Sequence, residues 1–573
     1  MNSVTLAIGA AVLYLVAYHT YGKFLGRKIF KLNPEAVCPS TEFQDNVDFV
    51  PTKKPILFGH HFTSIAGTGP IVGPAVAIIW GWVPAMLWIL VGSIFMGAVH
   101  DFGAMVVSLR NQGRSIGDLA SEVINKRVRI LFLLIIFFEL LIVVAIFGVV
   151  IAVVFSICPQ AVFPVFLEIP IAIWLGYMIY KKGAPHLPMS IIAVVAMYIT
   201  VVIGAYIPIT LPKMFGLGPI ALWVIVLLVY AYIASTLPVQ TLLQPRDYIN
   251  SHQLFVALAL LALGILVAHP PIVAPTANLA PKGAPPIWPM LFVVIACGAI
   301  SGFHALVSSG TSSKQCDAET SSLPIGYGGM LLEGMLATFV VIACAGGIAL
   351  GFAKGDQTFT GAAAFTQHYS SWVGGTGLGN RLSPVIVGSA NMIQALGIPK
   401  GIALTIMGVF IASFAATTMD TATRLQRYIV AELATAVGVP ALSTRHPATF
   451  IAVLTALILA FSTGASGVGA LTLWPLFGAT NQLLAGLALL VVTIYLAHRK
   501  SPVVYTMIPM VFMIFMTGWA MLINLTNFYA ASKWLLFCIG LITIALEIWM
   551  IIESIAVLKR VYGKEMGAVP ELR

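Results

Sequence analysis

The stretch Phe58–Pro74, FGHHFTSIAGTGPIVGP, decides the fold because it interrupts an apolar segment long enough to span a membrane. A helix interior disfavours Gly by about 1 kcal/mol and Pro by about 3 kcal/mol. In hydrocarbon, the freed backbone groups cost more still unless protein or water satisfies them. Gly67, Thr68 and Gly69 therefore predict a helix that unwinds where its backbone meets a ligand. The alternative is a kinked helix with packing glycines.

Composition places the whole chain in a membrane. Hydrophobic residues make up 59% of it, charged residues only 9%, and the mean hydropathy is +0.98. Soluble domains carry about 25% charged residues. Apolar segments of about 20 residues, enough to cross a bilayer, recur along the sequence and predict fifteen spans. They lie near 4–22, 58–81, 83–108, 130–156, 160–180, 188–208, 217–245, 252–269, 288–314, 328–351, 400–422, 447–463, 470–497, 503–527 and 533–558.

The distribution of basic residues predicts the orientation of these spans. Cytoplasmic loops carry an excess of Lys and Arg. With the N-terminus outside and the C-terminus in the cytoplasm, only six of the 30 basic residues face outward. These six are Lys213, Lys282, Lys354, Arg381, Lys400 and Lys533. The net charge of +10 is therefore explained by topology and lipid contact, and it does not indicate a nucleic-acid surface.

A second interruption is expected in the span 217–245, where STLPVQ breaks the apolar run. Five spans separate the two breaks, so the two halves would have opposite orientations, as in transporters built from inverted repeats. Ser235, Thr236 and Gln240 are then the candidate counterparts of the first break. The expected organisation is an N-terminal helix and linker (1–57), a first repeat (58–216), a second repeat with an outside insertion at 352–399 (217–440), and four C-terminal helices (441–573).

Two interrupted helices that face each other form a typical substrate site. Each resumed helix presents an N-terminus with about half a positive charge, which suits a carboxylate. The unwound carbonyls suit a cation. The sequence thus predicts substrate binding at Gly67, Thr68 and Gly69 on one side, and at Ser235, Thr236 and Gln240 on the other.

Five longer motifs carry a resemblance to a known family. GHHFTSIAGTGPIVGP, GAVHDF, LLQPRDYIN, SGFHALVSSGTSSKQ and IGYGGML resemble the carbon starvation proteins, which are peptide and pyruvate transporters of bacterial inner membranes. The resemblance implies cation-driven uptake of short peptides or of a small carboxylate such as pyruvate. The expected fold is an all-α polytopic membrane protein with a 5+5 inverted-repeat core of the leucine-transporter type. Cys316, in TSSKQCDAET, departs from the family pattern.

Ionisable residues inside spans are candidates for energy coupling. His61, on the first broken helix, and Glu139, midway along the span 130–156, could carry a proton and pair with each other. A sodium ion is the other option, because hard cations prefer oxygen ligands. It would sit among the hydroxyl groups of Ser308, Ser309, Thr311 and Ser312, whose alternative role is helix packing.

A metal or haem is a further option. His60, His61, His100 and His304 could gather on the inner side and hold a transition metal or a haem, which would make the chain a membrane-embedded metal or haem protein. No HExxH motif supports this, and no GxxxxGK[ST] loop supports ATP-driven pumping. A channel would not need two matched breaks. The expected partners are a small-molecule substrate and membrane lipids, without nucleic acid, and the chain is predicted not to be an enzyme.

Overall fold

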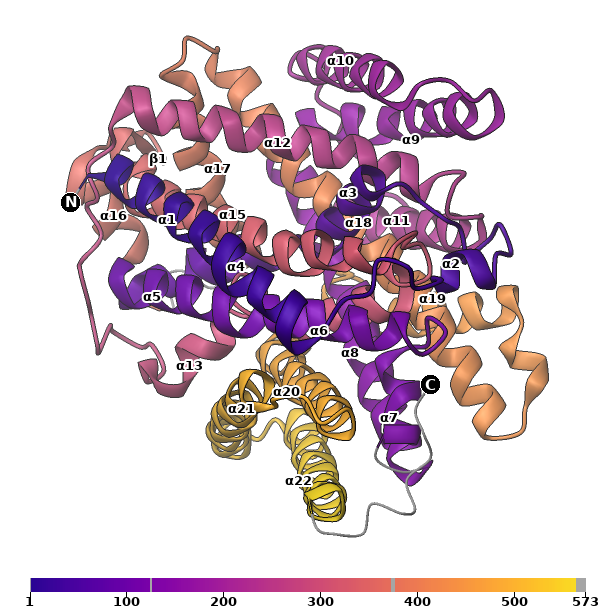
Figure 1. Cartoon of the computed structure of the whole chain (residues 1–573). Helices are drawn as coiled ribbons and strands as arrows, with labels where there is room; N and C mark the ends of the chain where they lie inside the picture. Colours follow the sequence, from indigo (N-terminus) through magenta and orange to yellow (C-terminus); the bar gives the residue numbers. More distant parts are fainter. Residues whose placement is uncertain (1, 124–125, 373–376, 563–573) are drawn as a thin grey trace.

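The structure is a computed structural model that describes residues 2–123, 126–372 and 377–562. It is almost entirely helical (Figure 1). The helices are α1 Ser3–Ala17, α2 Pro39–Glu42, α3 Lys54–Ile65, α4 Gly69–Ala77, α5 Trp82–Gly92, α6 Ala98–Leu109, α7 Ile116–Val123, α8 Lys126–Ile157, α9 Val162–Gly176, α10 His186–Gly204, α11 Pro219–Thr236, α12 Leu243–Ala268, α13 Ile287–Val294, α14 Gly302–Val307, α15 Gly329–Ala345, α16 Gly361–Tyr369, α17 Leu378–Gln394, α18 Lys400–Ala436, α19 Arg445–Ala460, α20 Trp474–His498, α21 Val504–Ala530 and α22 Trp534–Tyr562. Two short strands, β1 Phe352–Lys354 and β2 Gln357–Phe359, pair antiparallel.

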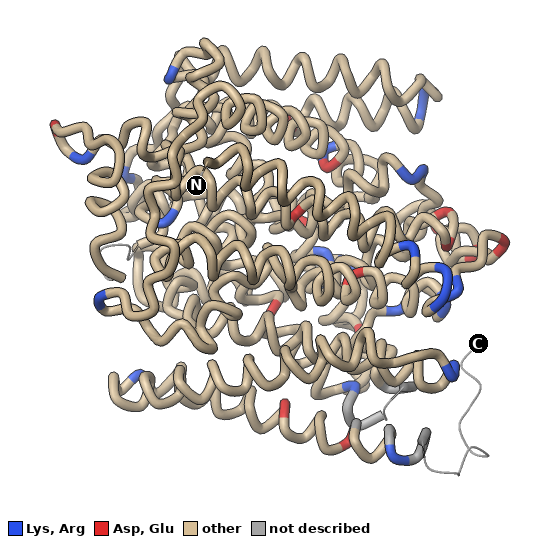
Figure 2. The backbone as a smooth tube through the Cα atoms, turned by 60° about the vertical axis from the view of Figure 1, so that its left-hand side comes forward, with Lys and Arg blue, Asp and Glu red and all other residues tan. Residues whose placement is uncertain are grey.

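Within the described residues, 12 helices are long and apolar enough to cross a membrane, and a bent pair of helices would make 13. The expected number, fifteen, is higher because two further apolar segments do not form single long helices. One is α19, which has 16 residues, and the other is the interrupted segment α13–α14. Figure 2 shows Lys and Arg mostly at the two ends of the long helices, with isolated acidic residues between them. This distribution is that of a multi-pass membrane protein.

The first predicted interruption is present. Helix α3 ends at Ile65, α4 begins at Gly69, and the two are bent by 44°. Pro70 lies in the first turn of α4, where the N–H that it lacks would be unpaired in any case. Gly69 does not have a positive φ angle. Its role is therefore close approach to a neighbour and not an unusual backbone conformation.

The second interruption lies elsewhere than expected. Helices α11 and α12 are each long enough to be a span, so the expectation of one broken span at 217–245 is wrong. Pro238 lies in the turn between them, and Pro245 occupies the first turn of α12 and does not end a helix. The expected continuous span at 288–314 is instead broken, because α13 ends at Val294 and α14 begins at Gly302.

The two interruptions meet in the middle of the fold. A Cβ atom on Gly69 would overlap the side chain of Cys297, and one on Gly298 would lie 3.7 Å from the Cα of Pro70. Around this point the packing is nearly symmetric. Helix α12 packs on α3, α20 packs on α14, and α8 packs along α18. Helices α11 and α19 each contact both α8 and α18. The helices α20, α21 and α22 lie together at the lower edge of Figure 1.

The loops form two groups, each joined by its own backbone contacts. On one side, Asn2 bridges to Pro271, and the N–H of Trp372 donates to the carbonyl of Lys282 at 2.9 Å. On the other side, Thr52 bridges to Cys316, and the loop after α11 bonds to the segment before α3. Residues 563–573, where the C-terminus was expected in the cytoplasm, lie outside the described part of the chain.

Candidate functional site

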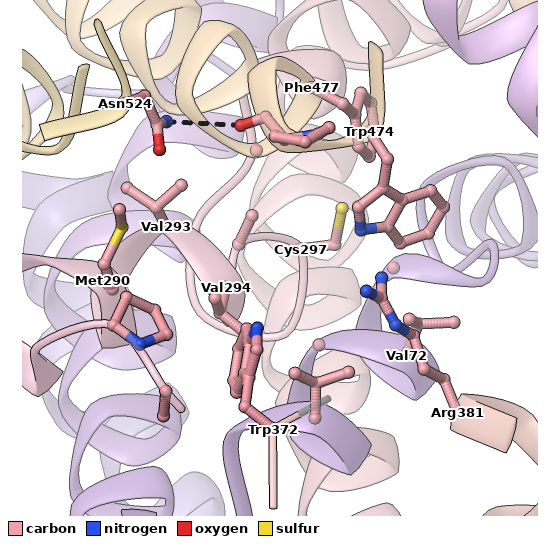
Figure 3. A pocket seen from close by; sticks show the side chains of 18 of the residues that line it. Val72, Met290, Val293, Val294, Cys297, Trp372, Arg381, Trp474, Phe477 and Asn524 are labelled. Atoms are coloured by element: carbon pink, nitrogen blue, oxygen red, sulfur yellow. Dashed lines mark hydrogen bonds between the residues drawn. The ribbon is translucent and has the colours of Figure 1, made fainter. Parts of the chain in front are cut away.

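A cavity of about 570 Å³ opens between the two interruptions. Thr68 and Gly69 line it from the first interruption, and Ala296 and Cys297 line it from the second. Its other walls come from the loop 283–286, from α8, from the first turns of α20, from α21 and from the insertion 352–399. Figure 3 shows these side chains converging from segments far apart in the sequence. The cavity therefore lies where two unwound backbone segments meet.

Most of the cavity wall is apolar, and a few polar groups face it. Arg381 carries the only charged side chain among its described lining residues, and its guanidinium lies 5.4 Å from the ring centre of Trp474. Trp372 and Asn524 also line the cavity (Figure 3), and Asn524 donates to the carbonyl of Pro475 at 3.3 Å. Helix α4 begins at Gly69, so the positive end of its dipole faces the same space. A carboxylate is the ligand group that suits these features.

The predicted substrate residues divide between two places. Thr68 and Gly69 line the cavity, whereas Gly67 lies behind it, where a Cβ atom would come 2.7 Å from the ring of Phe147. The other three predicted residues, Ser235, Thr236 and Gln240, lie far from the cavity, at the turn between α11 and α12. There Gln240 donates to the carbonyl of Asn46 at 3.2 Å, Thr236 bonds within its own helix, and Ser235 is buried.

His60 and His61 bond to different partners. His60 places Nδ1 2.5 Å from a carboxylate oxygen of Asp247, and its Nε2 lies 3.1 Å from the amide of Gln315. His61 bonds through Nδ1 to the hydroxyl of Ser312 at 2.8 Å. The two adjacent rings thus connect α3 with α12 and with the segment that follows α14. Both histidines are fully buried and do not line the cavity.

The predicted hydroxyl cluster is engaged with protein groups. Ser309 accepts the N–H of Ile116 at 3.0 Å, and Thr311 accepts from Gln315 at 2.8 Å. Ser312 bonds to His61, and Ser308 is buried with no hydrogen-bond partner among the described residues. Three of the four hydroxyl groups therefore hold neighbouring elements together.

Glu139 does not pair with His61, so the expected contact between these two side chains is wrong. One carboxyl oxygen of Glu139 accepts the hydroxyl of Thr480, on α20, at 2.6 Å. The two side chains bond to different elements, because Glu139 on α8 contacts α20 whereas His61 on α3 contacts the segment that follows α14. Spacing along the sequence contains no information about this difference.

The four histidines proposed as metal ligands do not converge. His60 is bonded to Asp247, whereas His100 and His304 share the carboxylate of Asp101, at 2.7 Å and 3.0 Å. No group of three or more His, Cys, Asp or Glu side chains in the described part of the chain is placed to hold a metal ion. Each histidine is matched with a carboxylate or hydroxyl group of the protein, so the geometry does not fit a metal or haem at these four residues.

An ionic contact joins the loop before α3 to α18, away from the cavity. Asp48, in the loop before α3, accepts from Arg424 at 2.7 Å, from Arg427 at 3.1 Å and from Tyr428 at 2.6 Å. Burial raises the pKa of Asp48, but Arg424 and then Arg427 outweigh it and hold the pKa at about 2. A carboxylate with a lowered pKa loses its stabilising contribution only when the pH falls through that value. The contact therefore stays charged at neutral pH.

We expect Asp48→Asn to let the loop before α3 separate from α18 more often. Losing the charged partner of two buried guanidinium groups weakens the contact by about 1.5–3 kcal/mol, or roughly 10- to 150-fold in the opening equilibrium. Cys316, which is fully buried beneath the same loop, reports the opening. Its alkylation by a polar maleimide should accelerate accordingly, whereas it should be unchanged in Glu42→Gln, which alters an exposed carboxylate nearby. Equal rates in the wild type and Asp48→Asn would contradict a closing role.

Comparison with known proteins identifies the family. The sequence profile described as carbon starvation protein CstA matches residues 2–520. The chain belongs to this family. It is 35% identical to the peptide transporter CstA of Campylobacter jejuni over 90% of this chain and 79% of the relative. It is also 29% identical to the pyruvate/proton symporter BtsT of Escherichia coli, over 93% and 84% of the two chains. The chain is therefore a membrane transporter and not an enzyme.

Solved structures resemble it more distantly. A manganese transporter from Eremococcus coleocola aligns with 90% of this chain and 99% of its own, at 12% identity and a TM-score of 0.49. A nucleobase-cation-symport-1 family transporter in a closed conformation aligns with 91% and 97%, at 13% identity and a TM-score of 0.44.

Sequence reasoning missed two parts of the site. Cys297 and its neighbours form the second interruption, and their sequence IACGAIS contains one glycine and no proline. Arg381 was assigned only to an outside loop. The available signal was its place near the start of α17, in an insertion that carries few other charged residues.

Proposed function

We propose that the chain is a secondary active transporter that takes up short peptides or a small carboxylate such as pyruvate, driven by a proton gradient. The observation that carries this proposal is the cavity between two helix interruptions, in which Arg381 is the only charged lining residue described. A cavity of about 570 Å³ falls within the range of small-molecule sites. It has room for a dipeptide as well as for pyruvate, and both carry a carboxylate.

We propose further that the core consists of two inverted repeats, as in transporters of the leucine-transporter type. The near-symmetric packing supports this. In this arrangement each helix of the first repeat has a counterpart in the second: α3–α4 corresponds to α13–α14, α5–α6 to α15, α8 to α18, α11 to α19 and α12 to α20. The repeats then run over 54–268 and 287–498. The hairpin α9–α10 is an insertion in the first repeat, and the segment 352–399 is an insertion in the second.

The proposed orientation places the N-terminus and the cavity mouth outside the cell. We expect a cysteine at Ala280, in the exposed loop before α13, to react with an impermeant maleimide added to intact cells. A cysteine at Gln44, which is exposed in the loop before α3, should react only after permeabilisation. Both variants are made in a background with Cys538→Ser, because Cys538 is exposed. The reverse labelling pattern would invert the orientation.

Reconstituted protein tests the function directly. Proteoliposomes that contain the wild type should accumulate labelled pyruvate or a labelled dipeptide against its gradient when the outside is acidic. They should not do so when only a sodium gradient is imposed. Empty liposomes give the background. Accumulation of neither compound would reject the proposed substrates, and sodium-dependent accumulation would reject the proposed driving ion.

A further inference from the structure

We propose that Asp101, His304 and Glu333 form the proton-binding site of this transporter. The proposal rests on the proposed function and deepens it by naming the groups that carry the proton. It replaces the pair His61 and Glu139, which the structure keeps apart. All three side chains are fully buried, and they come from α6, α14 and α15.

The three side chains lie in a row, with His304 between Asp101 and Glu333. Nδ1 of His304 lies 3.0 Å from Oδ2 of Asp101, and its Nε2 lies 3.4 Å from Oε2 of Glu333. The other oxygen of Asp101 is 2.7 Å from Nδ1 of His100. Neither carboxyl oxygen of Glu333 has a hydrogen-bond partner among the described residues, and neither does Nε2 of His304. His304 Nε2 and the Glu333 carboxyl group are thus a buried pair of polar groups without hydrogen bonds.

Counting donors and acceptors requires a proton within the cluster. An ionised Asp101 accepts from both Nδ1 atoms, which makes Nε2 of a neutral His304 an acceptor. An ionised Glu333 is also an acceptor only, so the two facing atoms would repel each other in a medium that cannot screen them. A proton on Glu333 removes the conflict, because the carboxyl group then donates to Nε2 of His304. The cluster therefore holds one proton in the conformation seen here, and this proton belongs to the group as a whole.

The position of the cluster connects it to the substrate cavity. His304 is the third residue of α14, directly after the second interruption, and its ring also approaches the backbone of Ile65, where α3 ends. Gly298, next to the cavity-lining Cys297, packs against Ala337, which lies one turn after Glu333 on α15. Movement of α14 relative to α6 and α15 would change both contacts of His304. An opening that admits water to Glu333 would stabilise its carboxylate and release the proton.

The surrounding groups favour a proton over a metal cation. Among the described residues, the titratable side chains around the cluster include His61 on α3, His100 on α6, Cys297 in the interruption and, beyond Cys297, Glu139 on α8. Sodium prefers several oxygen ligands. Here the central group is an imidazole, whose two nitrogen atoms can pass a proton but are poor ligands for a hard cation.

Two isosteric substitutions test the proposal. In proteoliposomes, Glu333→Gln and Asp101→Asn should reduce the accumulation ratio under an imposed pH gradient to one. Counterflow exchange of labelled for unlabelled substrate should persist, because exchange needs binding and alternation but no net proton movement. Substrate-induced proton uptake, followed with a pH-sensitive dye, should disappear with the accumulation. Glu547→Gln is the matched control, since Glu547 is a buried carboxyl on α22, remote from the cavity.

A second readout needs no substrate. Infrared difference spectra recorded after a pH jump should contain a protonated-carboxyl band in the wild type and in Glu547→Gln, and this band should be absent in Glu333→Gln. Wild-type accumulation together with an unchanged band in Glu333→Gln would overturn the proposal. If the wild type transports neither pyruvate nor dipeptide, the proposed substrates fail, but the infrared comparison still decides whether Glu333 holds the proton.

Discussion

Gly69→Leu is expected to reduce uptake to the level of empty liposomes while the protein still inserts and folds. A Cβ atom at this position already overlaps the side chain of Cys297, and the rest of a leucine would extend into the cavity. The two interruptions could then no longer approach each other. Initial uptake rates, normalised to the amount of protein that elutes as a single peak in detergent, provide the measurement.

Two variants separate this local effect from general damage. Gly9→Leu, on the exposed face of α1, meets no atom within 4 Å and should transport like the wild type. Gly69→Ala should be strongly impaired alone and partly restored when combined with Cys297→Gly, which removes the atoms it would overlap. Near wild-type uptake by Gly69→Leu would show that the break is only a packing kink and that the substrate site lies elsewhere.

Arg381→Gln is expected to raise the KM for carboxylate substrates. A hydrogen bond to a charged group contributes about 1.5–3 kcal/mol, which corresponds to roughly a 10- to 150-fold change. Arg381→Lys keeps the charge but loses the two-pronged geometry, so its KM should lie between those of the wild type and Arg381→Gln. Concentration dependence of initial uptake, measured at saturating proton gradient, separates KM from the maximal rate.

The control for Arg381 lies in the same insertion. Lys354, on β1, is exposed and outside the cavity, so Lys354→Gln should leave KM unchanged. A dipeptide with an amidated C-terminus should inhibit uptake of the labelled substrate only weakly in the wild type. It should inhibit uptake equally weakly in Arg381→Gln. An equal loss of affinity for the free and the amidated peptide would mean that Arg381 maintains the shape of the cavity and does not bind the carboxylate.

Several features of this protein follow from local sequence. The apolar segments predicted a polytopic helical membrane protein, and the Gly and Pro residues at 67–70 predicted the interruption between α3 and α4. The longer motifs indicated the family, which the profile match confirms. Each of these inferences depends on a property that neighbouring residues carry themselves, such as the burial of apolar side chains in lipid or the loss of a backbone donor at proline.

The second interruption could not be located in this way. Pro238 is a strong local signal, yet it marks a turn between two complete spans. The segment at 295–301 has weak local signals, yet it unwinds because Cys297 and Gly298 pack against Gly69 and Pro70. The backbone there is held open by a contact across more than two hundred residues, and helix propensity does not record such a contact.

Sequence alone determined the class of protein, its apolar spans, the first break and the types of residue available for chemistry. Tertiary structure decided which of these residues contact one another. His304 lies between Asp101 and Glu333, Glu139 bonds to Thr480, and Arg381 reaches the cavity from an insertion. The physical reason is that solvation and helix propensity act on each segment separately. Ion pairs, hydrogen bonds and close backbone contacts arise only when helices distant in the sequence pack together.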